Sequence, residues 1–404
     1  MHDPTDAFGG VDWATDAHAV CVVDGRGQVI VEFDVDNSAA GLGELVRRLE
    51  HAGVRRVAIE RPDGPVVDGL LEAALEVVVV TSRSVKALRE RYGTSGNKSD
   101  RSDAYVLADC LRTDGHRWRS LEPDTPATVT LRSHVRARKD LVENRVAVAN
   151  QLRAHLRIVF PGAVGLFRDI DSPISLRFLE RFPSATRAAW LSDKRLGSWL
   201  RANGYCGRKT PAKLYGRLKE APTGLLGDEG DARGTVTLAY VAILRALRAQ
   251  IDELDTRLDE LLDAHPDAVI FQSLPRCATV RAATLLAEIG DCRARFPDAE
   301  SLACLAGVAP STRASGRHRA VTFRFSSDKK LRDAICDFAG DSWRANAWAE
   351  ARYRQLRADG KTHAHAERIL ARTWIHIIWR CWQDHTPYDP TRHGGHRRLL
   401  EKAA

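Results

Sequence analysis

Two aspartates three residues apart, Asp100 and Asp103, lie in the segment NKSDRSDAYVLAD at residues 97–109. The pattern of this segment predicts the start of a helix, and residues three apart on a helix share a face. Two carboxylates held close together favour a positive charge between them, and a divalent cation is one candidate. The same pair is also common at solvated helix starts, where the helix dipole favours negative side chains. The pair alone does not distinguish these two interpretations.

Two further carboxylates, Asp12 and Glu60, interrupt or end predicted strands upstream of this segment. The upstream elements are three short strands within 8–34 with a tight DGRG turn, a helix within 37–53, a strand over 55–60, a helix through Leu70 and Leu71, an apolar strand over 77–80 and a basic helix over 84–91. This order is that of the ribonuclease-H fold, in which the first strand, the end of the fourth and a late helix meet at one end of a mixed sheet. The sequence therefore predicts that all four carboxylates converge.

Such a cluster has the chemistry of a two-metal site. Asp12, Glu60, Asp100 and Asp103 would form a DEDD set able to hold two Mg²⁺ ions roughly 3.5–4 Å apart, the spacing that clamps the attacking and leaving oxygens of a phosphate. Hard oxygen ligands favour magnesium, or manganese, over zinc. The four residues together predict a metal-dependent enzyme that acts on phosphate esters.

The composition fits a globular protein with a polyanionic partner. The chain has 404 residues, 44% of them hydrophobic and 28% charged, which predicts two or three domains. No apolar run is long enough to cross a bilayer and the first residues do not have the pattern of a signal peptide, so we expect a cytoplasmic protein without membrane association. Eight cysteines without a CxxC pair indicate neither a zinc site nor a disulfide framework.

The net charge of +8 is unevenly distributed along the chain. Residues 1–30 contain five aspartates and one arginine, whereas residues 131–157 and 311–332 each contain seven lysines and arginines. Carboxylates for metal ions followed by cations for phosphates are what a metal-dependent enzyme acting on nucleic acid needs.

Two long helices are predicted in the middle of the chain. Apolar residues recur at helical spacing over 126–160 and again over 241–261, up to His265 and Pro266. Residues 161–232 between them contain short helical pieces and no recognisable motif. The two helices could pair as an antiparallel hairpin or form the contact between subunits, and the pattern favours neither.

A polar, basic loop is predicted after the second long helix, within residues 311–334. It contains Ser315 and Gly316 among Arg313, Arg317, His318 and Arg319. A serine hydroxyl becomes a nucleophile when a base or metal activates it. The guanidinium of an arginine can donate two hydrogen bonds to the oxygens of one phosphate. The alternative interpretation is an ordinary Ser-Gly turn. The helical segment that follows, 341–386, carries tryptophans that we expect to pack in a core.

These features together resemble the insertion-sequence transposases of the family numbered one hundred and ten, which are bridge-RNA-guided DEDD recombinases. The motifs that carry the resemblance are GVDWAT, AIERPDG, GNKSDRSDAYVLAD, TLLAEIGD, LAGVAPSTRASGRHR and WIHIIWRCWQDHTPYDP. The resemblance implies an α/β N-terminal domain of the ribonuclease-H or RuvC-like type, an α-helical coiled-coil region and a mainly helical C-terminal transposase domain. The corresponding boundaries are 1–125, 126–265 and 266–390, followed by a basic tail over 391–404.

The resemblance also implies a function. It implies cutting and rejoining of donor and target DNA through a phosphoserine intermediate, directed by a structured guide RNA, by a homo-oligomer that is a dimer or tetramer. We expect such a protein in the bacterial cytoplasm, associated with the nucleoid when acting. Many relatives have an LPGIG hairpin where this chain has LPRCA at 274–278, so backbone contacts to phosphate at that turn are not expected here.

Matching the motifs residue by residue assigns roles. The resemblance implies that the metal-binding catalytic carboxylates are Asp12, Glu60, Asp100 and Asp103, and that the nucleophile is Ser315, in preference to Ser311, Ser326 or Ser327. The predicted phosphate-binding and nucleic-acid-binding residues are Arg313, Arg317, His318, Arg319, Lys98, Arg101, Arg132, Arg136, Arg138 and Lys139.

Three other functions are consistent with parts of the pattern. A metal-dependent junction nuclease would use water as its nucleophile and would form no covalent intermediate. An actin-like ATPase also begins with a strand, an aspartate and a hairpin, but Trp13 stands where that fold needs a phosphate-binding residue. A non-catalytic regulator would use only the basic patches.

Overall fold

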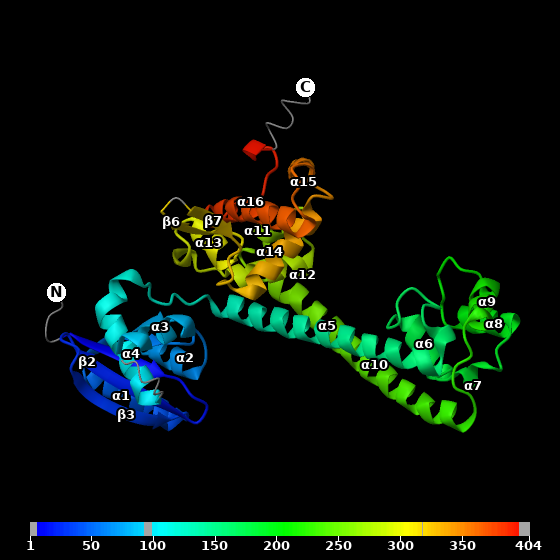
Figure 1. Ribbon diagram of the computed structural model, residues 1–404, viewed down its shortest axis with the longest axis horizontal. Coiled ribbons are helices and arrows are strands. Elements are labelled where there is room, and N and C mark those ends of the chain that lie inside the picture. Colours follow the sequence, from blue (N-terminus) through cyan, green and yellow to red (C-terminus); the bar gives the residue numbers. More distant parts are fainter. Residues whose placement is uncertain (1–5, 93–98, 317, 396–404) are drawn as a thin grey trace. The chain divides into compact units, whose positions relative to one another are not determined.

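The computed structural model describes residues 6–92, 99–316 and 318–395, in two compact units, residues 1–123 and 124–404. The first unit is built on a five-stranded mixed sheet with the strand order β3-β2-β1-β4-β5 (Figure 1). The strands are β1 (Ala7–Asp12), β2 (Ala17–Asp24), β3 (Val29–Asp36), β4 (Val54–Ile59) and β5 (Glu76–Val79). Strands β1, β2 and β3 are antiparallel neighbours, whereas β4 runs parallel to both β1 and β5. The predicted α/β order of elements is confirmed.

Each face of this sheet is covered by two helices. Helices α1 (Ala39–His51) and α2 (Pro65–Glu72) pack with Val11, Val20 and Val22 on one face. Helices α3 (Ser82–Tyr92) and α4 (Asp100–Asp114) pack with Phe8, Cys21 and Ala58 on the other, and the 3-10 turn η1 (Gly115–Arg117) follows α4. Alternating strand residues point to opposite faces, so β1 contributes Val11 to one core and Phe8 and Gly10 to the other.

Helix α4 lies directly on β1 because residue 10 is a glycine. A Cβ added at Gly10 would lie 2.2 Å from the carbonyl oxygen of Ala104 and 2.5 Å from the amide nitrogen of Ala108. No other residue type leaves room for this approach, so Gly10 sets how closely the middle of α4 approaches the carboxyl end of β1.

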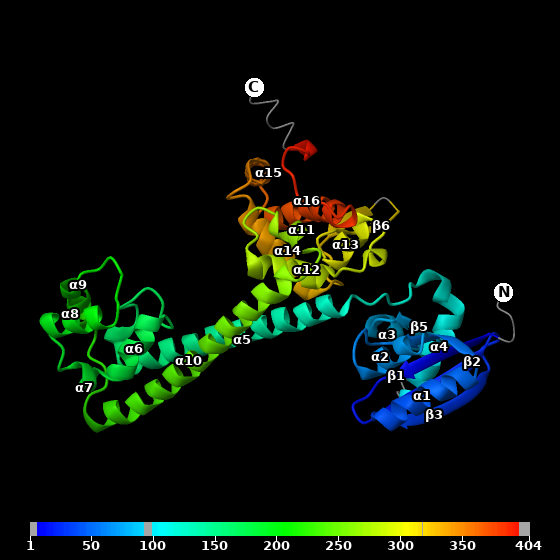
Figure 2. The ribbon, with the colours of Figure 1, turned by 180° about the vertical axis from the view of Figure 1, so that it is seen from behind.

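The second unit contains the two long helices, α5 (Pro126–Val159) and α10 (Gly227–Asp263), which pair within the chain as an antiparallel hairpin (Figures 1 and 2). Arg138 pairs with Asp255, whereas His155 Nε2 lies 3.0 Å from Thr237 Oγ1, so the partners run in opposite directions. The sequence left this pairing open.

The segment between the long helices forms a small core of its own. It contains η2 (Pro161–Ala163), α6 (Pro173–Arg181), α7 (Ala185–Ala188), α8 (Asp193–Ala202) and α9 (Pro211–Glu220). The rings of Phe178 and Trp199 meet edge to face in this core, with their centres 5.5 Å apart. They pack with Leu152 and Leu244 of the long helices.

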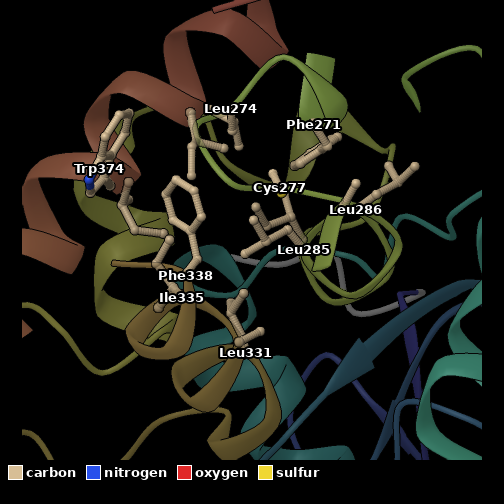
Figure 3. Close-up of a cluster of buried hydrophobic side chains, with 14 of the residues drawn as sticks. Phe271, Leu274, Cys277, Leu285, Leu286, Leu331, Ile335, Phe338 and Trp374 are labelled. Carbon is tan, nitrogen blue, oxygen red and sulfur yellow. The ribbon is translucent and has the colours of Figure 1, made fainter. Parts of the chain in front are cut away.

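The remaining elements build a larger core at the other ends of α5 and α10 (Figure 3). They are α11 (Ala268–Gln272), α12 (Thr279–Ile289), η3 (Arg293–Arg295), α13 (Ala299–Leu305), β6 (Ser311–Ser315), β7 (His318–Thr322), α14 (Lys329–Ser342), α15 (Ala347–Ala358) and α16 (His363–Gln383). Trp374 and Trp382 are fully buried in this core, which confirms the predicted packing role.

The prediction of a loop over 311–334 is wrong. Ser311–Ser315 and His318–Thr322 form the β6–β7 hairpin, and α14 begins at Lys329. Eight of the ten residues of the two strands are exposed, so the alternation of buried and exposed residues that marks a half-buried strand is missing.

Arg276, in the LPRCA segment at 274–278, has a backbone conformation that favours glycine. It has a φ of 56°, in the left-handed region that glycine adopts without strain. Its guanidinium Nε lies 2.8 Å from Asp341 Oδ2. The arginine thus gains an ion pair at a turn where a glycine would be conformationally favoured.

Candidate active-site residues

Asp12 and Glu60 lie side by side at one edge of the sheet. Asp12 is the last residue of β1, and Glu60 directly follows β4. The two strands are parallel neighbours with Val11 opposite Ile59. The residues that follow, Asp12 and Glu60, are therefore opposite each other at the carboxyl ends of the two strands. By strand alternation Asp12 shares the face of Gly10, and Glu60 shares that of Ala58, and this is the face covered by α4.

A contact between the next two residues ties these strand ends together. The guanidinium of Arg61 lies over the ring of Trp13, 4.2 Å from its centre. A cation–π contact of this kind holds the residues after Asp12 and Glu60 against each other. No local pattern indicates this contact, because Arg61 and Trp13 are 48 residues apart.

Asp100 and Asp103 both lie in the first turn of α4, as predicted. Ser99 caps the helix, with its side chain accepting a hydrogen bond from the Ser102 amide at 3.2 Å. Asp100 is exposed, whereas Asp103 is 1% exposed and points into the unit. The two aspartates therefore have different surroundings although they share a helix turn.

Arg89 on α3 pairs with the buried Asp103. Its Nε lies 2.5 Å from Oδ1, and its second nitrogen donates to Oδ2 at 2.8 Å. A carboxylate buried without compensation is costly, and here the guanidinium balances its charge. Among the described residues no group of three or more histidine, cysteine, aspartate or glutamate side chains is gathered closely enough to hold a metal ion.

The four carboxylates nevertheless have the chemistry that Mg²⁺ or Mn²⁺ needs. All are hard oxygen donors, and three of them, Asp12, Glu60 and Asp103, lie on the α4 side of the sheet. A metal ion bound by Asp103 would compete with Arg89 for the same oxygens.

Ser315 is exposed at the end of β6, in the second unit. It pairs with His318 across the turn, and Arg313 pairs with Ala320. Gly316 in the turn has a φ of 54°, which favours glycine. Alternation places Arg313 and His318 on the face of Ser315, whereas Arg319 and Ala314 lie on the opposite face. Arg317 and Lys98 lie outside the described residues.

The predicted basic residues of α5 are engaged in ion pairs within the fold. Arg136 donates to both carboxylate oxygens of the buried Glu288 at 3.0 and 2.8 Å. Arg132 pairs with Asp124, Arg138 with Asp255, and Lys139 with Asp333. Arg101 of α4 pairs with Asp34 at 2.8 Å. Their role in binding nucleic acid stays a prediction.

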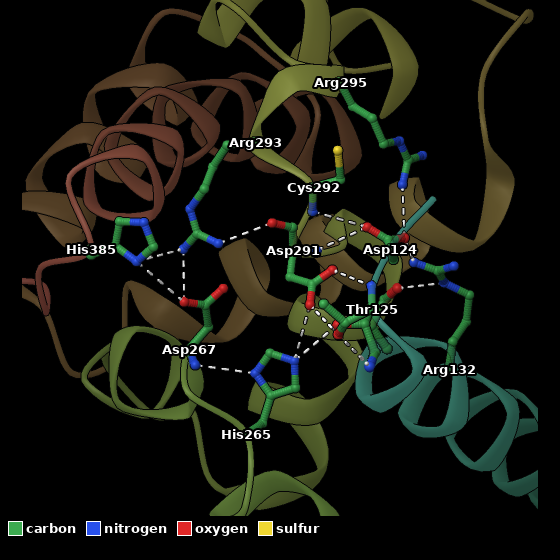
Figure 4. A network of polar contacts seen from close by, with 12 residues as sticks. Asp124, Thr125, Arg132, His265, Asp267, Asp291, Cys292, Arg293, Arg295 and His385 are labelled. Atoms are coloured by element: carbon green, nitrogen blue, oxygen red, sulfur yellow. Dashed lines mark hydrogen bonds and ion pairs between the residues drawn. The ribbon is translucent and has the colours of Figure 1, made fainter. Parts of the chain in front are cut away.

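A buried polar network fixes the start of α5 in the second unit (Figure 4). Asp124 accepts hydrogen bonds from the backbone amides of Asp291 and Cys292 at 3.0 and 3.1 Å and pairs with Arg132 and Arg295. Asp291 in turn accepts from the Thr125 amide at 2.9 Å. Sequence reasoning missed this network, although Asp291 ends the TLLAEIGD motif.

His265 lies beside this network and is neutral there. Its Nδ1 accepts a hydrogen bond from the Asp267 amide at 3.1 Å, so the ring proton is on Nε2, which lies 2.9 Å from Thr128 Oγ1. Burial lowers the pKa of His265. Burial disfavours the charged form of Asp291, but hydrogen bonds from Thr125 outweigh it and lower that pKa.

No helix in the described residues is both long and apolar enough to span a bilayer.

The chain is similar to transposases over its whole length. Residues 9–161 match a family described as "Transposase", and residues 268–354 match one described as "Transposase IS116/IS110/IS902 family". A mini-circle putative transposase for IS117 from Streptomyces coelicolor is 33% identical over 417 residues, which cover 100% of this chain and 99% of that protein.

Two further relatives are described as uncharacterized proteins of insertion elements. A 43.6 kDa protein of IS110 from Streptomyces coelicolor is 27% identical over 96% of this chain and 97% of its own length. A 42 kDa protein of IS900 from Mycobacterium paratuberculosis is 27% identical over 95% of this chain and 97% of its own length.

Proposed function

Because the chain belongs to the IS110 family of transposases, enzymes that act on DNA, we propose that it cuts and rejoins DNA strands through a serine-linked intermediate. The observation that carries this proposal is the placement of Asp12 and Glu60. They end adjacent parallel strands on the face covered by α4, the helix whose first turn contains Asp103. This placement supports the proposal of a RuvC-like site.

The carboxylates of the first unit would hold two Mg²⁺ ions, with Mn²⁺ as an alternative. The residues assigned to them are Asp12, Glu60, Asp100 and Asp103. When bound, the ions neutralise charge on the scissile phosphate and favour the ionised form of the attacking hydroxyl. The chain's own contribution is to fix the carboxylate positions through the β1 and β4 register and the Gly10 contact.

Ser315 is the proposed nucleophile. Its Oγ forms a bond to phosphorus while the bond to the departing strand oxygen breaks, and that oxygen gains a proton as the hydroxyl loses one. Reversal on a partner strand rejoins the DNA without ATP, because one ester replaces another. Arg313 lies on the same face of the hairpin and would stabilise the negative charge that develops on the phosphate oxygens.

A guide RNA and an oligomer complete the proposal. The carboxylates and Ser315 belong to different units, so one copy of the chain could supply the metal-binding residues and another the serine. Exchange of strands between two duplexes favours a dimer or tetramer. A structured RNA that pairs with donor and target DNA would supply the sequence specificity, and the motif pattern of the chain supports this role.

The test is trapping of the covalent intermediate. Full-length protein is incubated with Mg²⁺, its RNA and a nicked substrate that releases the departing strand, and adducts are measured on denaturing gels. We expect an adduct with the wild type and with Ser311→Ala or Ser326→Ala, and none with Ser315→Ala or Asp103→Asn. An adduct formed by Ser315→Ala would refute the assignment, whereas cleavage without any adduct would favour the nuclease that uses water.

A further inference from the structure

A cavity of about 480 Å³ opens beside the β6–β7 hairpin in the second unit. One wall comes from residues 307–310 and 321–324 at the base of the hairpin, and the other from residues 361–372 at the start of α16. Its described lining contains four side chains that are always cationic and no carboxylate. These are Arg324, Lys361, Arg368 and Arg372.

Helix geometry explains why two of the four cations, Arg368 and Arg372, face the cavity together. His365, Arg368 and Arg372 are spaced three and four apart, so they share one face of α16. Two of the four cations are held by the fold: Arg372 pairs with Glu300 at 3.0 Å, and Arg324 Nε donates to the Ala309 carbonyl at 3.2 Å.

The other two cations are not balanced in this way. Within the part of the chain that the structure describes, neither Lys361 nor Arg368 has a carboxylate oxygen within 4.0 Å. The cavity therefore has a net positive charge that an anion can neutralise.

Aromatic rings adjoin these cations. The guanidinium of Arg368 lies 5.0 Å from the centre of the Phe323 ring, and that ring meets Phe325 nearly at right angles at 5.0 Å. Phe325 is 79% exposed, which is unusual for a phenylalanine. Exposed aromatic rings next to a basic groove are how proteins bind unpaired nucleotides, by stacking on bases and pairing with phosphates.

We propose that this cavity binds the sugar–phosphate backbone of an unpaired DNA strand, with Phe325 stacking on one of its bases. The choice of DNA rests on the proposed function, because the same hairpin carries Ser315. The base of the hairpin, at Ser311, is four residues from Ser315, or about 13 Å at the rise of a strand. A stacked DNA strand has a phosphate about every 3.4 Å, so the cavity would hold it about four phosphates from the cut.

Binding of labelled oligonucleotides tests the proposal on the full-length protein. Fluorescence anisotropy is measured over a range of salt concentrations with unpaired DNA, duplex DNA and unpaired RNA of one sequence. The variants are Lys361→Gln combined with Arg368→Gln, and Phe325→Ala. Arg380→Gln is the matched control, because Arg380 lies on the same helix and pairs with Asp384. Thermal melts check that each variant is folded.

We expect the double variant to bind unpaired DNA with an affinity at least about tenfold lower than that of the wild type. The magnitude of the slope of log K against log salt should fall by about 1.4, because two phosphate contacts are lost and each contributes about 0.7. Phe325→Ala should weaken binding about fivefold or more without changing the slope. Affinity and slope equal to those of Arg380→Gln would overturn the proposal. A loss confined to duplex DNA or to RNA would overturn the assignment to unpaired DNA.

The result is separable from the fate of the proposed chemistry. Ser315→Ala leaves the cavity intact and should bind unpaired DNA as the wild type does. If no covalent adduct forms but the cavity variants still lose binding, the cavity stands and the nucleophile assignment fails. If adducts form normally and the cavity variants bind normally, only the cavity proposal fails.

Discussion

Arg89 and Asp103 form a two-point ion pair across α3 and α4, with contacts of 2.5 and 2.8 Å, and Asp103 is almost completely buried. The guanidinium covers both oxygens of a carboxylate that the proposed function assigns to a metal ion. Because the guanidinium and a metal ion are both cations that would use the same two oxygens, a metal ion bound at Asp103 would compete electrostatically with Arg89. The pair therefore links metal binding to the packing of α3 on α4.

Replacing Arg89 should weaken the metal-free protein and increase its response to metal. Arg89→Gln leaves the Asp103 carboxylate buried without its counter-charge. We expect a loss of about 2 kcal/mol in the free energy of unfolding, which is less than for a fully buried ion pair because the side chain of Arg89 is partly exposed. Mg²⁺ would then restore the missing charge. Urea unfolding with EDTA and with Mg²⁺ measures both effects.

Arg101→Gln is the control for this prediction. Arg101 pairs with Asp34 on the surface, where the loss of an ion pair changes stability by less than about 1 kcal/mol. Equal stabilisation of Arg89→Gln and wild type by Mg²⁺ would show that metal does not compete with Arg89.

Gly10→Ala should displace α4 from the sheet. The added Cβ meets backbone atoms of Ala104 and Ala108, which cannot rotate away, so we expect a loss of about 3 kcal/mol in the free energy of unfolding and a large loss of DNA cleavage. Gly69→Ala is the matched control. Gly69 lies within α2 with nothing within 4 Å of the added Cβ, so that variant should be unchanged or about 0.5–1 kcal/mol more stable. Equal unfolding curves for the two variants would contradict this account of the helix contact.

The part of the fold that depends on local patterns could be predicted from the sequence. Strand alternation, helical spacing and the DGRG turn gave the order of elements in the first unit, and the places of Asp12, Glu60 and Asp100 followed from that order. The β6–β7 hairpin did not follow, because its strands are exposed on both faces and show no alternation. The alternation of apolar and polar residues arises because one face of a strand is buried, so this pattern does not reveal strands with two exposed faces.

Long-range polar contacts could not be predicted in the same way. Asp124 and the Asp291 amide are 167 residues apart, and neither residue stands out in its own segment. The same holds for Arg136 and Glu288, which made the basic face of α5 resemble a free nucleic-acid-binding surface. Charge counts along a chain do not show which cations have partners inside the fold.

Stability of the second unit should depend on pH through His265. The ordinary pKa of histidine is near 6.5, and burial lowers the pKa of His265 in the folded protein. Between these two values only the unfolded chain binds the proton. The free energy of unfolding should therefore fall as pH drops below about 6.5, by less than about 1.4 kcal/mol per pH unit, and level off below the folded pKa.

His265→Gln should remove this contribution between pH 5 and 7, a range above the ordinary pKa of the nearby carboxylates. His134 is only partly buried and provides the control variant His134→Gln, which should keep the slope of the wild type. Urea unfolding followed by tryptophan fluorescence reports mainly on the second unit, which contains most of the tryptophans. An unchanged slope in His265→Gln would place the pH dependence elsewhere.

Arg313 and Arg319 should differ in their effect on the proposed chemistry. Both are exposed on the β6–β7 hairpin and both lie among its basic residues, but alternation places only Arg313 on the face of Ser315. If Arg313 stabilises the charge that develops on phosphate, Arg313→Gln should slow formation of the covalent adduct about 100-fold, the loss typical of one oxyanion donor. Arg319→Gln should change that rate by less than about tenfold, and affect mainly the binding of DNA. Single-turnover adduct formation at saturating DNA separates the two effects, since weaker binding is then compensated. Equal slowing by the two variants would mean that strand alternation does not determine which arginine reaches the phosphate.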